Sequence, residues 1–522
     1  MLSKPVTTLL ERLKYRETAN VSSGMDELIN INRITERAGA FYEKIRYLVD
    51  YKEERHIRRS AIERILKRKI IFEGAEKNLG MLLIQELIAG GYLANNAIAE
   101  RNATTIEKII HKYKRLEQCW PESFRSLPRA RRILVSLMGS EIESFFFPNK
   151  EDDLVAQAFY ETIKDHIKID VFVPNNFLNT QTLIACYRSL FDSDDESLFY
   201  VLWLVKNPDW PILDNDEKIK ETALESQSVF DEINHHINNH FSFRLVPRFY
   251  NYSIYFSVVR EVIRAYGLES ERVLSDKHML DRFVSDFLEK NYNKFYKKAR
   301  GSAVRAIIYI FCTKILIAIA LEVPYELYVL KQIGYLPIGI NITVHPLLLM
   351  FTTFSVKPLG EANTQDILNG IHSVLFEGEI RPIKIKAKES DLLSFTFLVL
   401  YGIMFVIVFG IIITFLKELQ FNIVSILLFL CFLALISYFS LRIRHSANKW
   451  KVRRDNDKMV ALAFNLFTLP IIRAGKWLSR KFSSINIFVF ILDFIIETPF
   501  KLLLHFSDAF VSFLKEKQED AY

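Results

Sequence analysis

The chain has 522 residues, of which 50% are hydrophobic and 25% charged, and its formal net charge is +7. A mean hydropathy of +0.11 excludes an intrinsically disordered chain, and 17 glycines with 15 prolines exclude a collagenous one. The average composition fits a globular protein, so the distribution of apolar residues along the chain has to decide the class.

The N-terminal segment carries charges every few residues and lacks the apolar core of a cleaved signal peptide, so we expect it to be cytosolic. No proline lies between Pro5 and Pro121. Apolar residues recur there at steps of three and four, at Ile31, Ile34, Ala38, Phe41, Ile45 and Leu48, and again at Ile62, Ile65, Leu66 and Ile70. This spacing predicts packed helices over residues 1–120, including a long antiparallel pair.

The segment from Lys44 to Lys69 is strongly basic, with ten cations against four carboxylates. It could bind nucleic acid, bind anionic lipid headgroups, or form a solvated face with ion pairs along the helix. No groove-reading fold or RNA-binding motif accompanies it, so nucleic acid is not expected as a partner. A solvated face is the commonest outcome, and headgroup binding would use Arg58, Arg59, Lys67 and Arg68.

Pro121 and Pro128 mark a boundary, after which residues 121–300 are expected to form a second helical subdomain. A short extended piece is expected between Phe243 and Tyr255.

The sequence DEINHHINNH places Glu232, His236 and His240 on one face of a helix, and Asp231 with His235 forms a second pair four residues apart. Histidines at this spacing can share a metal. The motif departs from HExxH because isoleucine, not glutamate, follows His236. We therefore expect a solvated polar face here and no metal site.

Motifs of enzymes are absent from the sequence: there is no phosphate-binding loop, dinucleotide fingerprint or nucleophile elbow. Four scattered cysteines, Cys119, Cys186, Cys312 and Cys431, show no CxxC spacing and predict neither a disulfide framework nor a zinc site. We expect no catalytic residue and no cofactor.

After the second helical subdomain, the segments 303–323 and 332–356 are each long enough to cross a membrane but contain polar or charged residues, which makes them weak span candidates. Lys314 interrupts the first, and the second contains Asn341 and His345 together with two prolines. If both segments span the membrane, Lys314 and His345 come to similar depth and form a candidate intramembrane polar site. The alternative, which the sequence favours, is that Lys314 extends from a tilted helix to the membrane surface.

The strongest signal is a pair of uncharged runs at 392–416 and 421–441, each long enough to cross a membrane. Four residues separate them, which predicts a tight antiparallel hairpin. Gly402 and Gly410 lie eight residues apart and predict a face where a neighbouring helix approaches closely.

Cations gather at both outer ends of this hairpin, whereas its turn carries a single lysine. The cations are Arg381, Lys384, Lys386 and Lys388 before it, and Arg442, Arg444, Lys449, Lys451, Arg453 and Arg454 after it. The positive-inside rule places both ends in the cytosol. The number of upstream crossings is then even, either zero or two.

The tail, residues 442–522, is apolar but punctuated by charges and by two prolines. Lys476, Trp477, Arg480 and Lys481 have the basic and aromatic character of an anchor at headgroup level. Packing against protein explains such a face equally well.

Together these features predict an all-α membrane protein of the cell membrane, multi-pass with two to four spans, both termini cytosolic and an amphipathic tail. Its expected parts are 1–120, 121–300, 301–356, 357–391, 392–441 and 442–522. The expected function is a membrane-anchored scaffold or interaction module, and the alternative is an oligomeric transporter or channel component. Expected partners are the lipid bilayer, anionic lipid headgroups, and a protein partner or a second copy of the chain.

Overall fold

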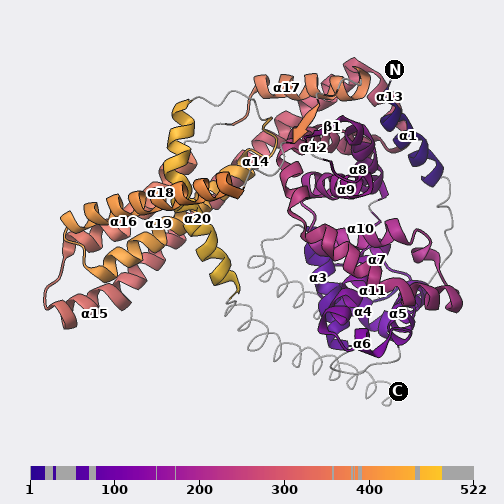
Figure 1. Cartoon of the computed structure of the whole chain (residues 1–522), viewed down its shortest axis with the longest axis horizontal. Coiled ribbons are helices and arrows are strands. Elements are labelled where there is room, and N and C mark those ends of the chain that lie inside the picture. Colours follow the sequence, from indigo (N-terminus) through magenta and orange to yellow (C-terminus); the bar gives the residue numbers. More distant parts are fainter. Residues whose placement is uncertain are drawn as a thin grey trace, which may run out of the picture.

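The structure, a computed structural model, describes residues 2–17, 28–30, 54–69, 78–148, 150–170, 172–354, 358–377, 380, 382–385, 391–452 and 459–484. These residues are almost entirely helical, which confirms the all-α fold class. Figure 1 shows a globular part and an elongated part that projects from it. We call the first the helical domain (α1 to α13, the beginning of α14, and α17) and the second the membrane bundle (the rest of α14 with α15, α16, α18 and α19).

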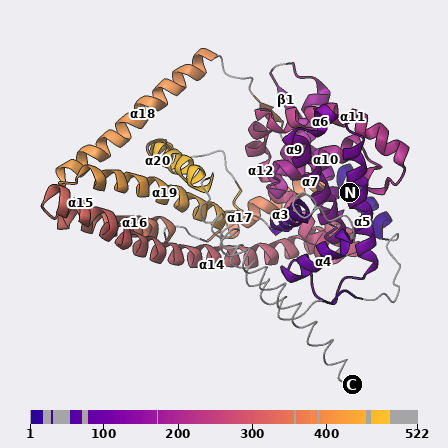
Figure 2. The ribbon, with the colours of Figure 1, turned by 90° about the horizontal axis from the view of Figure 1, so that it is seen from below.

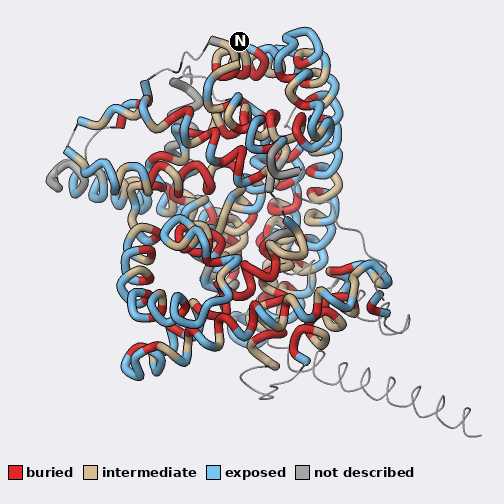
Figure 3. The backbone as a smooth tube through the Cα atoms, turned by 90° about the vertical axis from the view of Figure 1, so that its right-hand side faces the viewer, coloured by how far each residue is buried: buried red, intermediate tan, exposed pale blue. Residues whose placement is uncertain are grey.

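The helical domain is built from amphipathic helices whose apolar faces meet in one core, and Figure 3 shows the buried residues on their inner sides. The helices are α1 (Lys4–Glu17), α3 (Glu54–Lys67), α4 (Leu79–Ala89), α5 (Arg101–Gln118), α6 (Glu122–Arg125), α7 (Pro128–Phe146), α8 (Lys150–Ile163), α9 (Asn175–Phe191), α10 (Asp195–Lys206), α11 (Asp216–Asn238), α12 (His240–Tyr266) and α13 (Ser270–Ser275). Short 3-10 turns occur at Lys164–His166, Trp210–Ile212 and Gly267–Glu269.

The second apolar stripe predicted in the first 120 residues is confirmed on α3, where Ile62, Ile65 and Leu66 are buried in the core. The first stripe, 31–48, lies outside the described residues, as does Ile70.

The extended piece expected between Phe243 and Tyr255 is wrong, because α12 runs through it as a helix with Pro247 inside. Leu245 and Phe249 are fully buried there, and this packing outweighs the backbone hydrogen bond that a proline removes. Strand structure occurs elsewhere, where β1 (Ile167–Ile169) pairs in parallel with β2 (Ile383–Ile385). Both strands read Ile-Lys-Ile, too short to show a period of two.

The membrane bundle begins with α14 (Lys277–Ile317), which continues through π-helical turns at Ala318–Glu322 and Glu326–Leu330 on either side of α15 (Val323–Tyr325). Its other helices are α16 (Tyr335–Phe354), α18 (Asp391–Glu418) and α19 (Ile423–Ala447). Between α16 and α18, the chain forms α17 (Glu361–His372) of the helical domain and a π-helical turn at Ser373–Glu377, and α20 (Met459–Ser484) follows α19. Among the described residues, four helices are long and apolar enough to cross a membrane: Lys277–Leu330, Tyr335–Phe354, Leu398–Glu418 and Ile423–His445. The upper end of the predicted range, four spans, therefore fits the structure.

Helix α14 belongs to both parts of the molecule. Leu280, Val284 and Leu288, spaced by four, are buried in the core of the helical domain. Ile310, further along the same helix, is buried in the membrane bundle. With 41 residues at 1.5 Å per residue, α14 is about 60 Å long. The helical domain therefore continues into the first membrane helix without a break.

Two later segments also return to the helical domain. Strand β2 precedes α18 and is paired to β1. After α19, Trp450 packs edge-on against Phe287 of α14, with ring centroids 5.3 Å apart. The Asn363 side chain of α17 donates to Tyr292 Oη (2.7 Å) and to the Trp450 carbonyl (2.8 Å), which joins three segments. All three connections contact one domain, so they lie on one side of any membrane that the bundle crosses.

The hairpin of α18 and α19 is tight only at its turn. Figure 2 shows the two helices diverging from that turn, with α20 lying between them. The close helix contact expected at Gly402 and Gly410 does not form in the chain, since nothing lies within 4 Å of a Cβ placed on either glycine. The close approach occurs at Gly475 of α20, where a Cβ would lie 1.9 Å from the carbonyl oxygen of Ala434 on α19.

This crossing yields a test of the packing. We expect Gly475→Ala to lower the unfolding free energy by about 1–3 kcal/mol, because the added methyl group meets backbone that cannot rotate away. The matched control, Gly402→Ala, adds the same methyl group to open space on another membrane helix and should be neutral or slightly stabilising. Thermal unfolding of the purified chain in detergent measures both, and equal melting temperatures would contradict the crossing.

Candidate functional site

Ionisable side chains lie inside the membrane bundle. Lys314 of α14, Glu322 of the following π-helical turn and His345 of α16 are each at most 1% exposed, and Asn341 of α16 is fully buried between them. Charged groups at membrane depth are costly and are found where a partner or a function holds them. These four residues are the candidate site.

A chain of hydrogen bonds joins the cation to the carboxylate. Lys314 Nζ donates to Asn341 Oδ1 at 2.6 Å, and Asn341 Nδ2 donates to Glu322 Oε1. The ammonium also lies over the Phe432 ring of α19, 4.0 Å from its centroid. One lysine and one glutamate, eight residues apart along the same helix, are thus bridged by an asparagine from the neighbouring helix.

His345 sits between two backbone carbonyls. Its Nδ1 lies 3.0 Å from the carbonyl oxygen of Asn341, and its Nε2 lies 3.0 Å from that of Phe429 on α19. The Phe429 ring packs edge-on against the imidazole at 4.6 Å. The histidine therefore ties α16 to α19.

A second carboxylate, Glu326, lies at the end of the bundle farthest from the helical domain. Asn422 Nδ2, at the turn between α18 and α19, donates to its Oε1 at 2.8 Å, and the Gly334 amide donates to its Oε2 at 2.7 Å. Ser425, fully buried on α19, lies beside Glu322.

The structure brings together the two residues predicted for this site, Lys314 and His345, through Asn341. Because the Lys314 side chain is 1% exposed, it does not extend to the membrane surface as the sequence favoured. Sequence reasoning missed Glu322 and Glu326. The available signal was that Glu322 is a carboxylate inside the 303–323 span candidate itself and Glu326 follows it closely.

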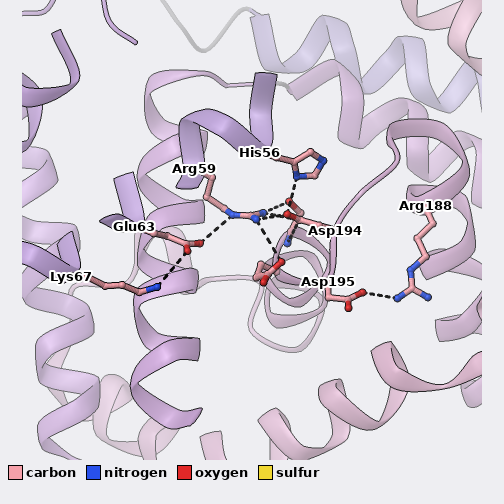
Figure 4. Close-up of polar contacts among 9 residues, drawn as sticks. His56, Arg59, Glu63, Lys67, Arg188, Asp194 and Asp195 are labelled. Carbon is pink, nitrogen blue, oxygen red and sulfur yellow. Dashed lines mark hydrogen bonds and ion pairs between the residues drawn. The ribbon is translucent and has the colours of Figure 1, made fainter. Parts of the chain in front are cut away.

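The helical domain contains a separate charged cluster, centred on Arg59 of α3 and Asp194 at the start of α10 (Figure 4). Arg59 donates to both carboxylate oxygens of Asp194 and, at 3.2 Å, to Glu63. His56 Nδ1 lies 2.9 Å from Asp194 Oδ2. Asp194 also caps α10 by accepting from the Ser197 amide at 3.0 Å. This cluster fastens α3 to α10.

Burial on its own would raise the pKa of Asp194, but the hydrogen bonds from His56 and Arg59 hold it well below its usual range. Burial likewise raises the pKa of Glu63, with Arg59 and Lys67 opposing it.

The cations considered for headgroup contact, on α3 and directly after it, each pair with a residue of the helical domain. Arg59 is 5% exposed, so it lies within the domain and not on its surface. Arg58 donates to Glu143 at 3.2 Å and stacks over Phe147 at 4.0 Å. Lys67 pairs with Glu63 at 4.0 Å, and Arg68 pairs with Glu86.

The corresponding residues of the tail lie on α20. Lys476, Trp477 and Lys481 are exposed, Trp477 to 61%, and the side chain of Arg480 is outside the described set. The stretch 485–522 of the predicted tail also lies outside the described residues.

The histidine cluster on α11 does not form a metal site in the part of the chain that the structure describes, where no three potential ligands converge. The His236 ring accepts a contact from Gln181 Nε2 at 3.3 Å and packs beside Phe177. His240 lies at the start of α12, next to Phe243.

No protein-family model, curated protein or solved structure matches this chain.

The Arg59 cluster gives a prediction for stability. Asp194→Asn should lower the unfolding free energy by about 2–4 kcal/mol, because it leaves a buried guanidinium short of its main partner. Since the pKa of Asp194 is lowered in the folded chain, the stabilisation is present above the pKa of an unfolded aspartate, about 4, and is lost as the pH falls below it.

The control is Asp216→Asn, which breaks the exposed pair with Arg115 and should cost less than about 1 kcal/mol. Thermal unfolding at neutral pH and in acid compares the variants. A gap between Asp194→Asn and the parent chain that persists unchanged into strong acid would refute the assignment.

Proposed function

We propose that this chain is a multi-pass protein of the cell membrane that presents its helical domain on the cytosolic side as a rigid interaction module. The observation that carries the proposal is the attachment of the membrane bundle to the domain at three places: α14, the β1–β2 pair, and the Trp450 contact. A domain held in this way keeps a fixed orientation to the membrane, which favours binding to a protein partner or to a second copy of the chain.

Charge supports the cytosolic placement. Cations surround the end of the bundle that meets the helical domain: Lys294, Lys297, Lys298, Arg300, Arg442, Arg444, Lys449 and Lys451. The far end carries Lys331 and Lys417 together with carboxylates. By the positive-inside rule, the end near the helical domain faces the cytosol.

Side-specific labelling tests this orientation. In a cysteine-depleted background, Gln332→Cys and Lys417→Cys should react with a membrane-impermeant maleimide in intact cells, because both side chains are exposed at the far end. Glu361→Cys and Lys449→Cys, exposed near the helical domain, should react only after permeabilisation. The reverse labelling pattern would place the helical domain outside the cell and contradict the proposal. Labelling of all four cysteines in intact cells would exclude it as well.

Rigid presentation is tested by a distance distribution. Spin labels at Ile212→Cys, on the domain surface, and Lys417→Cys, at the far end of the bundle, should give one narrow distance peak in lipid nanodiscs. Asn363→Ala with a flexible insert at Gly301 should broaden that peak, since the insert interrupts α14 and the substitution removes a hydrogen bond that supports the Trp450 contact. A broad distribution in the parent chain would argue against a rigid module.

A second candidate function, an oligomeric transporter or channel component, is favoured by the buried Lys314–Asn341–Glu322 chain with His345 beside it. Ionisable residues inside a helical bundle commonly mark ion or proton paths. Four spans are few for such a protein, so this function would need several copies of the chain.

A further inference from the structure

The buried polar residues of the bundle form a column with a direction. Glu326 marks its far end, at the turn between α18 and α19, and Glu322, Asn341 and Lys314 follow inward. His345, its innermost member, lies ten residues into α16, about 15 Å from the start of that helix. We call these five residues the polar column.

An apolar plug closes the column toward the helical domain. Ile310, Leu349 and Ile436, one from each of α14, α16 and α19, form a cluster of buried residues. Ile310 lies four residues before Lys314 and Leu349 four residues after His345, so both are one helical turn from the inner end of the column. Ile436 lies four residues after Phe432, whose ring contacts the Lys314 ammonium. Polar contacts resume beyond the plug, where Ser440 Oγ donates to Thr352 Oγ1 at 2.7 Å. The plug therefore separates two polar stretches of the same interior.

Counting hydrogen-bond donors indicates the charge of His345. Both ring nitrogens lie 3.0 Å from carbonyl oxygens, which only accept. A neutral imidazole has one N–H and would turn a lone pair toward the other carbonyl, whereas the imidazolium donates to both.

Counting charges gives the same answer. Glu322 and Glu326 are two carboxylates, and each accepts a hydrogen bond from an asparagine side chain. Lys314 balances one of them. A protonated His345 brings the column to zero net charge, the least costly state inside a membrane. The other titratable group near Lys314 among the described residues is the Cys431 thiol of α19, which is neutral when protonated.

The column also holds atoms that could pass a proton along it. Glu322 Oε2 and Ser425 Oγ are buried and make no hydrogen bond within the described structure. Both can accept a proton or a hydrogen bond. A metal cation is disfavoured at this position because the Lys314 ammonium is bonded, through Asn341, to the same carboxylate.

We propose that His345 is a proton-binding site that exchanges protons through the polar column with the side of the membrane away from the helical domain. A proton taken from water on the far side converts the imidazole to imidazolium. When the imidazolium releases this proton, the proton returns to the far side, because the plug blocks the path toward the helical domain. Loss of the proton leaves the ring with one N–H for two carbonyls, so it can no longer donate both to Asn341 within α16 and to Phe429, the contact that ties α16 to α19. The proposal goes beyond an interaction module and requires only that the bundle spans a membrane, which labelling at Gln332 and Lys417 tests separately.

Nitrogen-15 NMR of the full chain in lipid bilayers tests the site directly. His345 is assigned as the signal missing from His345→Gln, and His111→Gln on the exposed face of α5 serves as the control. We expect two protonated ring nitrogens at about pH 6 and conversion to one as the pH on the far side rises. One bare ring nitrogen throughout about pH 5–8 would overturn the proposal.

Proton leak through proteoliposomes tests the plug. Leu349→Ser should speed the decay of an imposed pH gradient by roughly tenfold, because it places a hydroxyl between the two polar stretches. Leu347→Ser, two residues away on the same helix but 54% exposed toward the lipid side, should leak like the parent chain. Equal leak rates for the two variants would show that the column does not end at the plug.

Discussion

The structure depends on accommodating one ammonium group in an apolar interior. A lysine at the centre of a membrane helix costs about 2.5–3.5 kcal/mol on insertion scales, and Lys314 is almost completely buried. Asn341 reduces this cost by accepting from Lys314 and donating to Glu322. Both bonds form only if α16 packs beside α14 in one register. That register sets the turn at the far end of the bundle, where Glu326 meets Asn422 at the start of α19. The polar bonds therefore specify how three membrane helices align, which uniform apolar contacts alone would leave undetermined.

Helix α14 carries Lys314 in the bundle and is also buried in the helical domain, so one continuous helix connects the polar column to that domain. The other two connections reinforce the link, since Asn363 joins Tyr292 of α14 to the backbone after α19. Coupling between distant sites needs a physical element that both of them bias. Here one continuous helix has an end in each environment: Leu280, Val284 and Leu288 are buried in the core of the helical domain, and Lys314 is buried in the bundle.

Sequence reasoning succeeded where a long uncharged stretch is enough to predict a membrane-spanning helix. Uncharged stretches located α18 and α19. The same reasoning named Lys314 and His345 as a candidate pair but favoured a Lys314 side chain that reaches the membrane surface, whereas Lys314 is buried. Sequence reasoning failed where the outcome depends on distant partners. On a regular α-helix that continues from Lys314, Glu322 would not face Asn341. The π-helical turn at Ala318–Glu322 rotates the following residues around the helix axis and brings Glu322 to that side. Similarly, the count of cations on α3 could not reveal that Arg59 meets Asp194, 135 residues later in the chain. The strand pairing of β1 with β2 spans a still longer separation, and three residues carry too little pattern to predict it.

The two buried charge clusters solve the same problem differently because their surroundings differ. Arg59 and Asp194 touch directly at the edge of the helical domain, where the Asp194 side chain is 29% exposed and water can share in solvating it. Lys314 and Glu322 lack that help, and they belong to one helix, so direct contact between them would tie no second helix into place. The side-chain amide of Asn341 accepts from the Lys314 ammonium and donates to the Glu322 carboxylate. Because Asn341 belongs to α16, both charged groups find their hydrogen-bond partner only when α16 is packed against α14. In the domain the ion pair strengthens an existing contact between α3 and α10, whereas in the bundle the bridged pair requires the contact between α14 and α16 for its own stability.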